Sequence, residues 1–179
     1  MVKAIEMLVE EHKNILRVTE AIERECEQIS SGKTVNEDFF TKVIDFIRNY
    51  ADKLHHAKEE DILFKEFLKQ AEQGRVHCNP IEQMLYEHDV GRSYVKALEE
   101  GVKESNKEKI TKNALGYAGL IRGHIFKEDN VLYPMSEQAL SKKTFENIQK
   151  AFTKINEKNK NEIEKYAGFA RESEKEGEK

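Results

Sequence analysis

The sequence predicts an all-α fold, an antiparallel up-down four-helix bundle with an additional C-terminal helix. Charged residues make up 36% of the 179 residues, and the chain contains only two prolines. Such a composition is typical of long helices with solvated faces. Turn signals divide the chain into segments whose apolar residues recur every three or four positions, which is the helical period. The length suits a single domain with one core.

The first predicted helix spans residues 2–29 and ends at the turn SSGK, and the second spans about 34–72. Thr34 and Glu37 have the spacing of a capping box at the start of the second helix. The apolar faces of the two helices contain Ile5, Leu8, His12, Ile15, Thr19, Ile22, Cys26 and Ile29, and Phe40, Ile44, Ile47, Ala51, His55, Glu59 and Ile62. Each face therefore includes a histidine.

The third helix is expected to begin at Asn79 and Pro80, and the fourth follows the segment ESNKEK. Their apolar faces contain Ile81, Met84, His88, Gly91, Val95, Leu98 and Val102, and Ile110, Ala114, Tyr117, Ile121, His124, Glu128 and Val131. These four helices define a bundle over residues 1–140. Residues 141–172 predict one amphipathic helix packed on the same domain, and we expect the charged tail 173–179 to be frayed.

The chain contains a weak internal repeat. The segment HHAKEEDILF aligns without gaps on HIFKEDNVLY, 69 residues further along, and the pair Glu11 and His12 corresponds to Glu87 and His88. Both halves therefore have the order His followed by His-x-x-x-Glu. Two hairpins of similar plan predict a bundle with approximate twofold symmetry.

The repeated histidines and glutamates predict a metal site. Residues four apart lie on the same face of a helix, so His55 with Glu59, and His124 with Glu128, each turn a nitrogen and an oxygen inward. A single histidine on an apolar face is usually an ordinary core residue. Four imidazoles and two carboxylates in one apolar core, however, require a compensating cation.

The kinds of ligand restrict the metal to iron, manganese or zinc, because calcium and magnesium prefer oxygen throughout. Six protein ligands are too many for a single zinc with an open position. Two metals fit better, since bridging by Glu59 and Glu128 would give each metal two nitrogens and two oxygens. That leaves room for a solvent-derived bridge and one open coordination position. The absence of HExxH from the sequence argues against a zinc protease.

These motifs resemble the hemerythrin-like proteins, the HHE cation-binding domain family. The resemblance covers residues 1 to about 140 and is based on EEHKNI, HHAKEEDILF, YEHD and HIFKEDNVLYP. It implies a four-helix bundle around two non-haem iron ions, with two bridging carboxylates and an oxo or hydroxo bridge. His12 and His55 would serve one iron, and His88 and His124 the other.

One position departs from the oxygen-carrying members of that family. They have a fifth histidine four residues before the one matched by His88, where this chain has Met84. The resemblance therefore favours the subset with four histidines and two carboxylates, with a more open second iron. This subset is similar to the di-iron domain of iron-sulfur-cluster repair proteins linked to nitric oxide stress.

These features predict a cytoplasmic di-iron protein that binds or reacts with oxygen, nitric oxide or peroxide. Iron storage or donation, or redox sensing without catalysis, is the alternative, and whether the chain is an enzyme stays open. A formal net charge of -4 argues against a nucleic-acid partner. The lack of a long apolar run argues against a membrane span or a signal peptide.

Other titratable side chains receive weaker interpretations. His56 lies about 100 degrees from the apolar face in an α-helix and is expected to be solvated or to support a ligand. Glu60 and Asp129 are interpreted as solvated charges that could instead orient a histidine. Tyr117 is expected to be a core residue, with a contact to the metals as the alternative. His77 and Cys78 are loop residues where a reactive thiol or second metal site is conceivable, and Cys26 is interpreted as structural.

Overall fold

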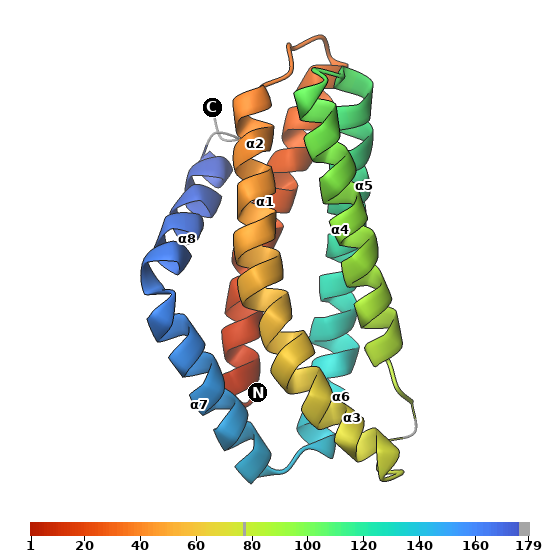
Figure 1. Cartoon of the computed structure of the whole chain (residues 1–179), viewed down its shortest axis with the longest axis vertical. Helices are drawn as coiled ribbons and strands as arrows, with labels where there is room; N and C mark the ends of the chain where they lie inside the picture. The colour runs from red at the N-terminus through yellow and green to blue at the C-terminus, as the bar shows by residue number, and fades with distance from the viewer. Residues whose placement is uncertain (77, 176–179) are drawn as a thin grey trace.

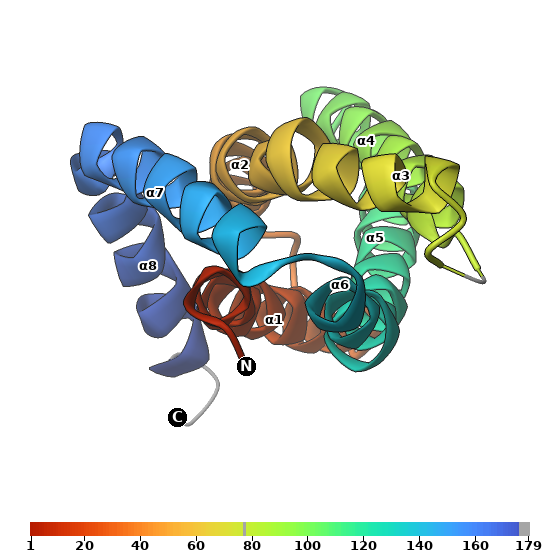
Figure 2. The same ribbon diagram turned by 90° about the horizontal axis from the view of Figure 1, so that it is seen from below.

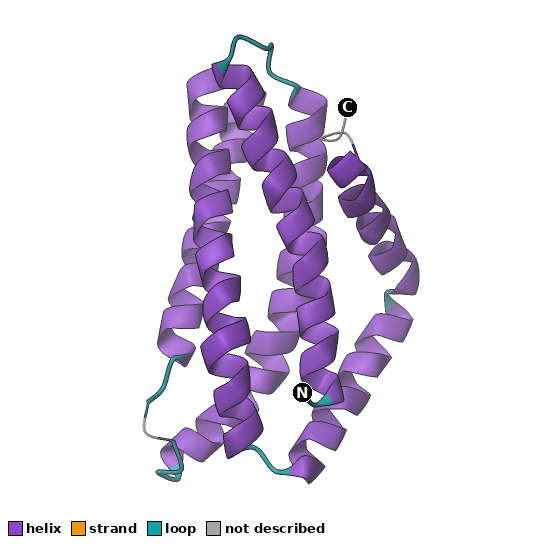
Figure 3. Cartoon of the chain, turned by 180° about the vertical axis from the view of Figure 1, so that it is seen from behind, coloured by secondary structure: helices purple, strands orange, loops and turns teal. Residues whose placement is uncertain are grey.

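The computed structural model describes residues 1–76 and 78–175, and all regular structure within them is helical (Figure 3). Figure 1 shows long helical rods side by side along the vertical axis, with two C-terminal helices against one side. The all-α class expected from the apolar periodicity is therefore confirmed.

Each of the four rods follows one of the predicted apolar faces. The first rod is α1 (Lys3–Ser30) and the third is α4 (Ile81–Lys103). The second rod runs through α2 (Glu37–Phe46), η1 (Ile47–His56), η2 (Glu59–Leu63) and α3 (Phe64–Glu72). The fourth rod runs through α5 (Lys107–Lys127), η3 (Glu128–Leu132) and α6 (Tyr133–Ala139). Seen end on, the rods surround a common interior (Figure 2).

The start of the second rod differs from the predicted capping box. Asn36 caps α2, because its side-chain oxygen accepts a hydrogen bond from the backbone N–H of Phe39 at 3.0 Å. Thr34 therefore lies before the helix rather than at its cap. The rod ends where expected, at a turn in which Gly74 has a positive φ of 68° that favours glycine.

Three segments, η1, η2 and η3, are π-helical, with hydrogen bonds that span five residues instead of four. Such segments are rare and frequently occur at functional sites. The segments η2 and η3 begin at Glu59 and Glu128, which are 69 residues apart. The internal repeat of the sequence is thus also a repeat of backbone conformation.

The π-helical turns correct two predicted core positions. Val131 is 46% exposed and Ile62 is only partly buried, whereas the next residues, Leu132 and Leu63, are 1% and 0% exposed. A wider turn accommodates one extra residue, so the buried face moves one position along the chain in both halves. Val102 is also only partly buried, at the end of α4.

Two apolar clusters fill the interior, and the predicted site lies between them along the rods. On α1, Leu8 belongs to one cluster and Ile15 to the other, with His12 between them. The second rod repeats this order, since Glu59 lies between Leu54 and Leu63. A polar layer enclosed by apolar residues on both sides is shielded from bulk water, which strengthens electrostatic interactions inside it.

The C-terminal segment forms two helices, α7 (Lys142–Lys158) and α8 (Lys160–Lys175), instead of the single helix predicted over 141–172. They meet at Asn159, and both pack along α1 (Figure 1). Ser173 is buried within α8, so the expected frayed tail does not begin there. Residues 176–179 lie outside the described residues. No described helix is long and apolar enough to cross a membrane.

Candidate metal centre

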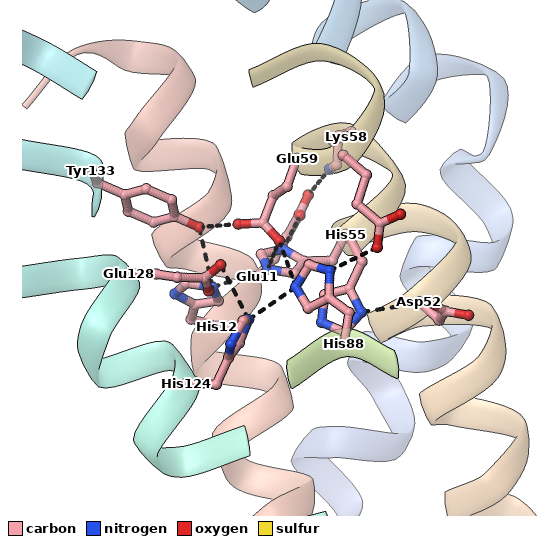
Figure 4. A network of polar contacts seen from close by, with 12 residues as sticks. Glu11, His12, Asp52, His55, Lys58, Glu59, His88, His124, Glu128 and Tyr133 are labelled. Carbon is pink, nitrogen blue, oxygen red and sulfur yellow. Dashed lines mark hydrogen bonds and ion pairs between the residues drawn. The ribbon is translucent and has the colours of Figure 1, made fainter. Parts of the chain in front are cut away.

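The structure brings all six predicted site residues together in the interior of the bundle (Figure 4). Each is at most 2% exposed. The first rod supplies His12, the second His55 and Glu59, the third His88, and the fourth His124 and Glu128. Their role as ligands stays a prediction, but their convergence on one buried layer is a finding.

The four imidazoles form two pairs whose Nε2 atoms face each other. The Nε2 atoms of His12 and His55 lie 2.9 Å apart, and those of His88 and His124 lie 3.0 Å apart. Two nitrogens bound at about 2.1 Å to one cation at a right angle would be about 3 Å apart. Each pair therefore has the spacing of two neighbouring ligands of one ion.

A carboxylate fixes the outer nitrogen of every imidazole. His12 donates from Nδ1 to Asp129 at 2.9 Å, and His88 donates to Glu60 at 2.7 Å. His55 and His124 likewise donate to Glu11 at 3.0 Å and to Glu87 at 2.9 Å. When Nδ1 donates, the neutral ring presents its lone pair at Nε2, the arrangement found in metal-bound histidines. Glu60 and Asp129 thus orient histidines, and the expectation that they are solvated charges was wrong.

Glu59 and Glu128 lie between the two imidazole pairs. Glu128 has one oxygen 3.3 Å from His12 Nε2 and the other 3.2 Å from His124 Nε2. Glu59 Oε2 lies 3.6 Å from His55 Nε2 and 3.7 Å from His88 Nε2. Both oxygens of Glu128 and Oε2 of Glu59 are buried without a hydrogen-bond partner. Unpaired buried carboxylate oxygens are costly, so this arrangement fits a position between two cations.

The two central carboxylates of the buried layer have strongly perturbed pKa values. Burial and the neighbouring charge of Glu128 raise the pKa of Glu59 above its usual value. Burial also opposes ionisation of Glu128, but His124 and His12 hold the pKa of that carboxyl below its usual value. Two adjacent buried carboxylates that cannot both ionise comfortably are typical of functional sites.

Cationic side chains support three of the orienting carboxylates. Lys58 donates to Glu11 and, at 3.1 Å, to Asn156 of α7, and it is 0% exposed. Lys127 donates to Glu87, and Arg92 donates to Glu60 at 2.7 Å. These three cations therefore hold three of the four carboxylates that orient the imidazoles.

The symmetry breaks at the aromatic side chains that end the repeat. Tyr133 donates its hydroxyl to Glu59 Oε1 at 2.7 Å, and its oxygen lies 3.3 Å from His12 Nε2 (Figure 4). The corresponding residue, Phe64, stacks beside His88 with ring centroids 6.0 Å apart and has no hydroxyl. Of these two aromatic residues, only Tyr133 has a proton to donate, and it lies beside the first imidazole pair.

His56 is not solvated, which corrects one of the two sequence interpretations and leaves the other, that it supports a ligand. It is 6% exposed, and it forms with Glu59, His88 and His124 a group of potential ligand atoms within 4.8 Å of one another. The second such group contains His12, His55, Glu59 and Glu128. Burial and the neighbouring His88 lower the pKa of His56 to about 4, so the ring is neutral.

A cavity of about 210 Å³ borders His88 of the second pair. Most of its surface is apolar, and its lining includes His56, His88, Gly91 and Tyr117. Tyr117 is a core residue, as predicted, and its buried hydroxyl has no hydrogen-bond partner. Apolar cavities of about 150 Å³ can hold a molecule the size of benzene. The cavity therefore has room for a small molecule next to His56 and His88.

Several residues around the site were missed in the sequence. Glu11 and Glu87 had been noticed only as repeated neighbours of histidines, and Lys58 and Lys127 also recur at the repeat distance. The repeat was thus a usable signal for these pairs. The repeat gives no such signal for Tyr133, because the residue aligned with it is Phe64. Of the weaker candidates, Cys26 is buried as expected, Cys78 is exposed and His77 lies outside the described residues.

A family model described as the hemerythrin HHE cation-binding domain matches residues 3–136. Comparisons with curated proteins and with solved structures gave no significant match. The matched segment contains all four rods except the last residues of α6, and both groups of potential metal ligands.

Proposed function

Because this chain belongs to the hemerythrin HHE cation-binding domain family, we propose that it is a non-haem di-iron protein. It binds or reacts with oxygen, nitric oxide or peroxide at an open coordination position. The observation that supports this most directly is the set of paired Nε2 atoms and unpaired carboxylate oxygens in one buried layer. Imidazole with carboxylate, and without thiolate, suits non-haem iron.

In this proposal His12 and His55 hold one iron, and His88 and His124 hold the other. Glu59 and Glu128 would bridge the two ions together with an oxo or hydroxo group. The distances that support the assignment are those within each imidazole pair and those from Glu128 to His12 and His124. Manganese or zinc is the less favoured occupant.

When bound, two iron ions would supply electrons and a position for the small molecule. The chain's own residues prepare the surroundings. The apolar clusters on both sides of the layer exclude water, and the orienting carboxylates hold each imidazole with Nε2 inward. Tyr133 keeps a proton next to Glu59 Oε1, where it can be donated to an oxygen atom without a path to bulk water.

The remaining parts of the proposal concern setting and architecture. An antiparallel up-down order of the four rods is supported by their side-by-side course in Figure 1. A cytoplasmic location and a role in oxidative or nitrosative stress, or in repair of iron-sulfur centres, extend the proposal. Iron storage or donation and redox sensing are the alternatives. The location, the roles and these alternatives are all argued from the sequence.

The test begins with metal analysis of protein purified in the absence of oxygen. Two irons per chain are expected, and one zinc or no metal would refute the di-iron proposal. Protein reconstituted with ferrous iron is then exposed separately to oxygen, nitric oxide and hydrogen peroxide while its visible spectrum and peroxide loss are followed. Turnover supports an enzyme, and a stable adduct supports binding or sensing. No spectral response to any of the three would favour storage.

Substitutions connect the metal content to particular residues. His88→Ala or Glu59→Ala should halve or abolish the iron content, because each removes a predicted ligand from the buried layer. His77→Ala is the control, since His77 lies outside the repeated motifs. Equal losses in all three variants would show that the ligands have been chosen wrongly.

A further inference from the structure

His56 is buried next to His55, although the two side chains of adjacent residues leave a helix in different directions. In an α-helix, adjacent residues point about 100 degrees apart. Here both side chains are buried, at 1% and 6% exposure, at the end of the π-helical segment η1. In the other half of the repeat, the residues that precede His124 belong to α5, which is an α-helix. The unusual segment therefore occurs in the half of the repeat that contains His56.

The contacts of His56 connect it to the second imidazole pair. Its ring stacks on His88 with centroids 3.8 Å apart and an angle of 15° between the planes. It also meets the ring of His124 at 5.9 Å in an edge-to-face arrangement. The group that can surround one ion contains His56 with both of these histidines and Glu59.

His56 also follows the plan by which the other four imidazoles are oriented. Its Nδ1 lies 3.4 Å from a carboxylate oxygen of Asp52, at the outer limit of hydrogen-bonding distance, and it has no well-aligned partner. Arg92 donates to Asp52 at 2.7 Å and to Glu60 at 2.7 Å. One guanidinium therefore holds both the carboxylate beside His56 and the carboxylate that orients His88.

Packing does not require an imidazole at this position. The internal repeat aligns His56 with Ile125, an aliphatic residue that is 3% exposed in the fourth rod. An apolar side chain thus fills the corresponding place without an unsatisfied polar atom. The imidazole of His56 therefore brings a polar group into the core that packing alone does not require.

We propose that His56 is a fifth imidazole ligand, which completes the second metal position alongside His88, His124 and Glu59. The inference rests on the proposed di-metal function. It also changes one expectation, because Met84 does not leave the second position short of a nitrogen; the nitrogen comes from the second rod instead. The first position, with His12 and His55, is then the one with the open coordination site, and it lies beside the hydroxyl of Tyr133.

The test compares three variants by metal binding instead of activity. His56→Phe keeps an aromatic ring to stack on His88 but removes both nitrogens, and His56→Ala removes ring and nitrogens together. Ile125→Ala is the matched control, since it truncates the corresponding buried side chain of the other half. Circular dichroism and thermal unfolding of the metal-free proteins identify any variant that fails to fold.

Titration with cobalt(II) in competition with a chelator measures the two positions separately. We expect wild type and Ile125→Ala to bind two ions per chain. In both His56 variants the first ion should bind normally, and the second should bind at least about 100-fold more weakly. The cobalt spectrum of the second position should change in intensity, because its coordination number falls.

Added imidazole provides a second readout. The cavity beside His56 has a volume of about 210 Å³, so free imidazole should restore the second ion in His56→Ala but not in His56→Phe. Normal binding of both ions by His56→Phe would overturn the inference and reduce His56 to a stacking residue. A wild-type protein that binds no pair of metals would instead overturn the proposed function, and this inference with it.

Discussion

Tyr133 and Tyr117 are both tyrosines of the core, and they differ in whether the hydroxyl has a hydrogen-bond partner. Both are buried, but Tyr133 donates to Glu59 whereas the hydroxyl of Tyr117 has no partner. Tyr133→Phe should lower the free energy of unfolding of the metal-free protein by about 1–3 kcal/mol, because Glu59 loses its donor. Tyr117→Phe is the control and should leave stability unchanged or raise it. Denaturant unfolding measures both, and equal effects would contradict the assigned hydrogen bond.

His12 predicts a pH dependence of the metal-free protein. Burial disfavours its charged form, but Asp129 and Glu128 raise the pKa of His12 to about 9, above the ordinary value of 6.5. The stabilisation is therefore fully present below about pH 6.5 and is lost as the pH rises through 9. Metal loading should abolish this dependence, because a metal ligand must be the neutral ring.

Asp129→Asn separates His12 from the other titrating groups. The variant should be less stable than wild type by roughly 1–3 kcal/mol at pH 6.5, and the difference should shrink by pH 9.5. Unfolding in the presence of a chelator at several pH values measures it. A difference that stays constant with pH would mean that Asp129 stabilises the fold without holding a proton on His12.

At this scale the sequence predicted the six central residues and not their surroundings. The spacing of His55 to Glu59 and of His124 to Glu128 is decisive because four residues bring two side chains to one helical face. The hydrogen bond from His12 to Asp129 joins two rods, and the two residues are 117 positions apart in sequence. Contacts of this kind depend on how the rods are rotated, which no local spacing reveals.

The π-helical segments decide which residues of an element face the core. A prediction based on an α-helical period buries Ile62 and Val131, whereas the structure buries Leu63 and Leu132 in their place. Local sequence could not reveal this shift, since both EEDIL and EDNVL read as ordinary helix. The shift is imposed by tertiary packing. One extra residue per turn lets Glu59 and Leu63, or Glu128 and Leu132, face inward together.

Alanine substitutions test this phase shift. Leu63→Ala and Leu132→Ala should each lower the free energy of unfolding by about 2–5 kcal/mol, because each leaves a cavity in the core. Val131→Ala should cost about 0.5 kcal/mol or less, as expected for an exposed position. Ile62→Ala should fall between these limits. A larger loss for Val131→Ala than for Leu132→Ala would restore the α-helical phase and contradict the π-helical segment.

At the scale of the whole molecule, α7 and α8 make the two halves of the bundle unequal. The predicted helix 141–172 indicated that this segment packs on the bundle, but not which half it covers. In the structure α7 reaches Lys58, through Asn156 at 3.1 Å and the ring of Phe152 at 5.7 Å from its ammonium. The corresponding Lys127 of the other half is 38% exposed. The choice of side depends on the complementary surfaces of folded helices, so periodicity could not predict it.

This inequality predicts different costs for one substitution made in both halves. Lys58→Met removes a fully buried ammonium and leaves Glu11 without its cation, so it should lower the free energy of unfolding by about 3–5 kcal/mol. Lys127→Met removes the corresponding partner of Glu87 at a partly solvated position and should cost about 1 kcal/mol or less. Denaturant unfolding of both variants measures the difference. If α7 did not seal the first half, water would reach Glu11 as it reaches Lys127, and the two costs would be equal.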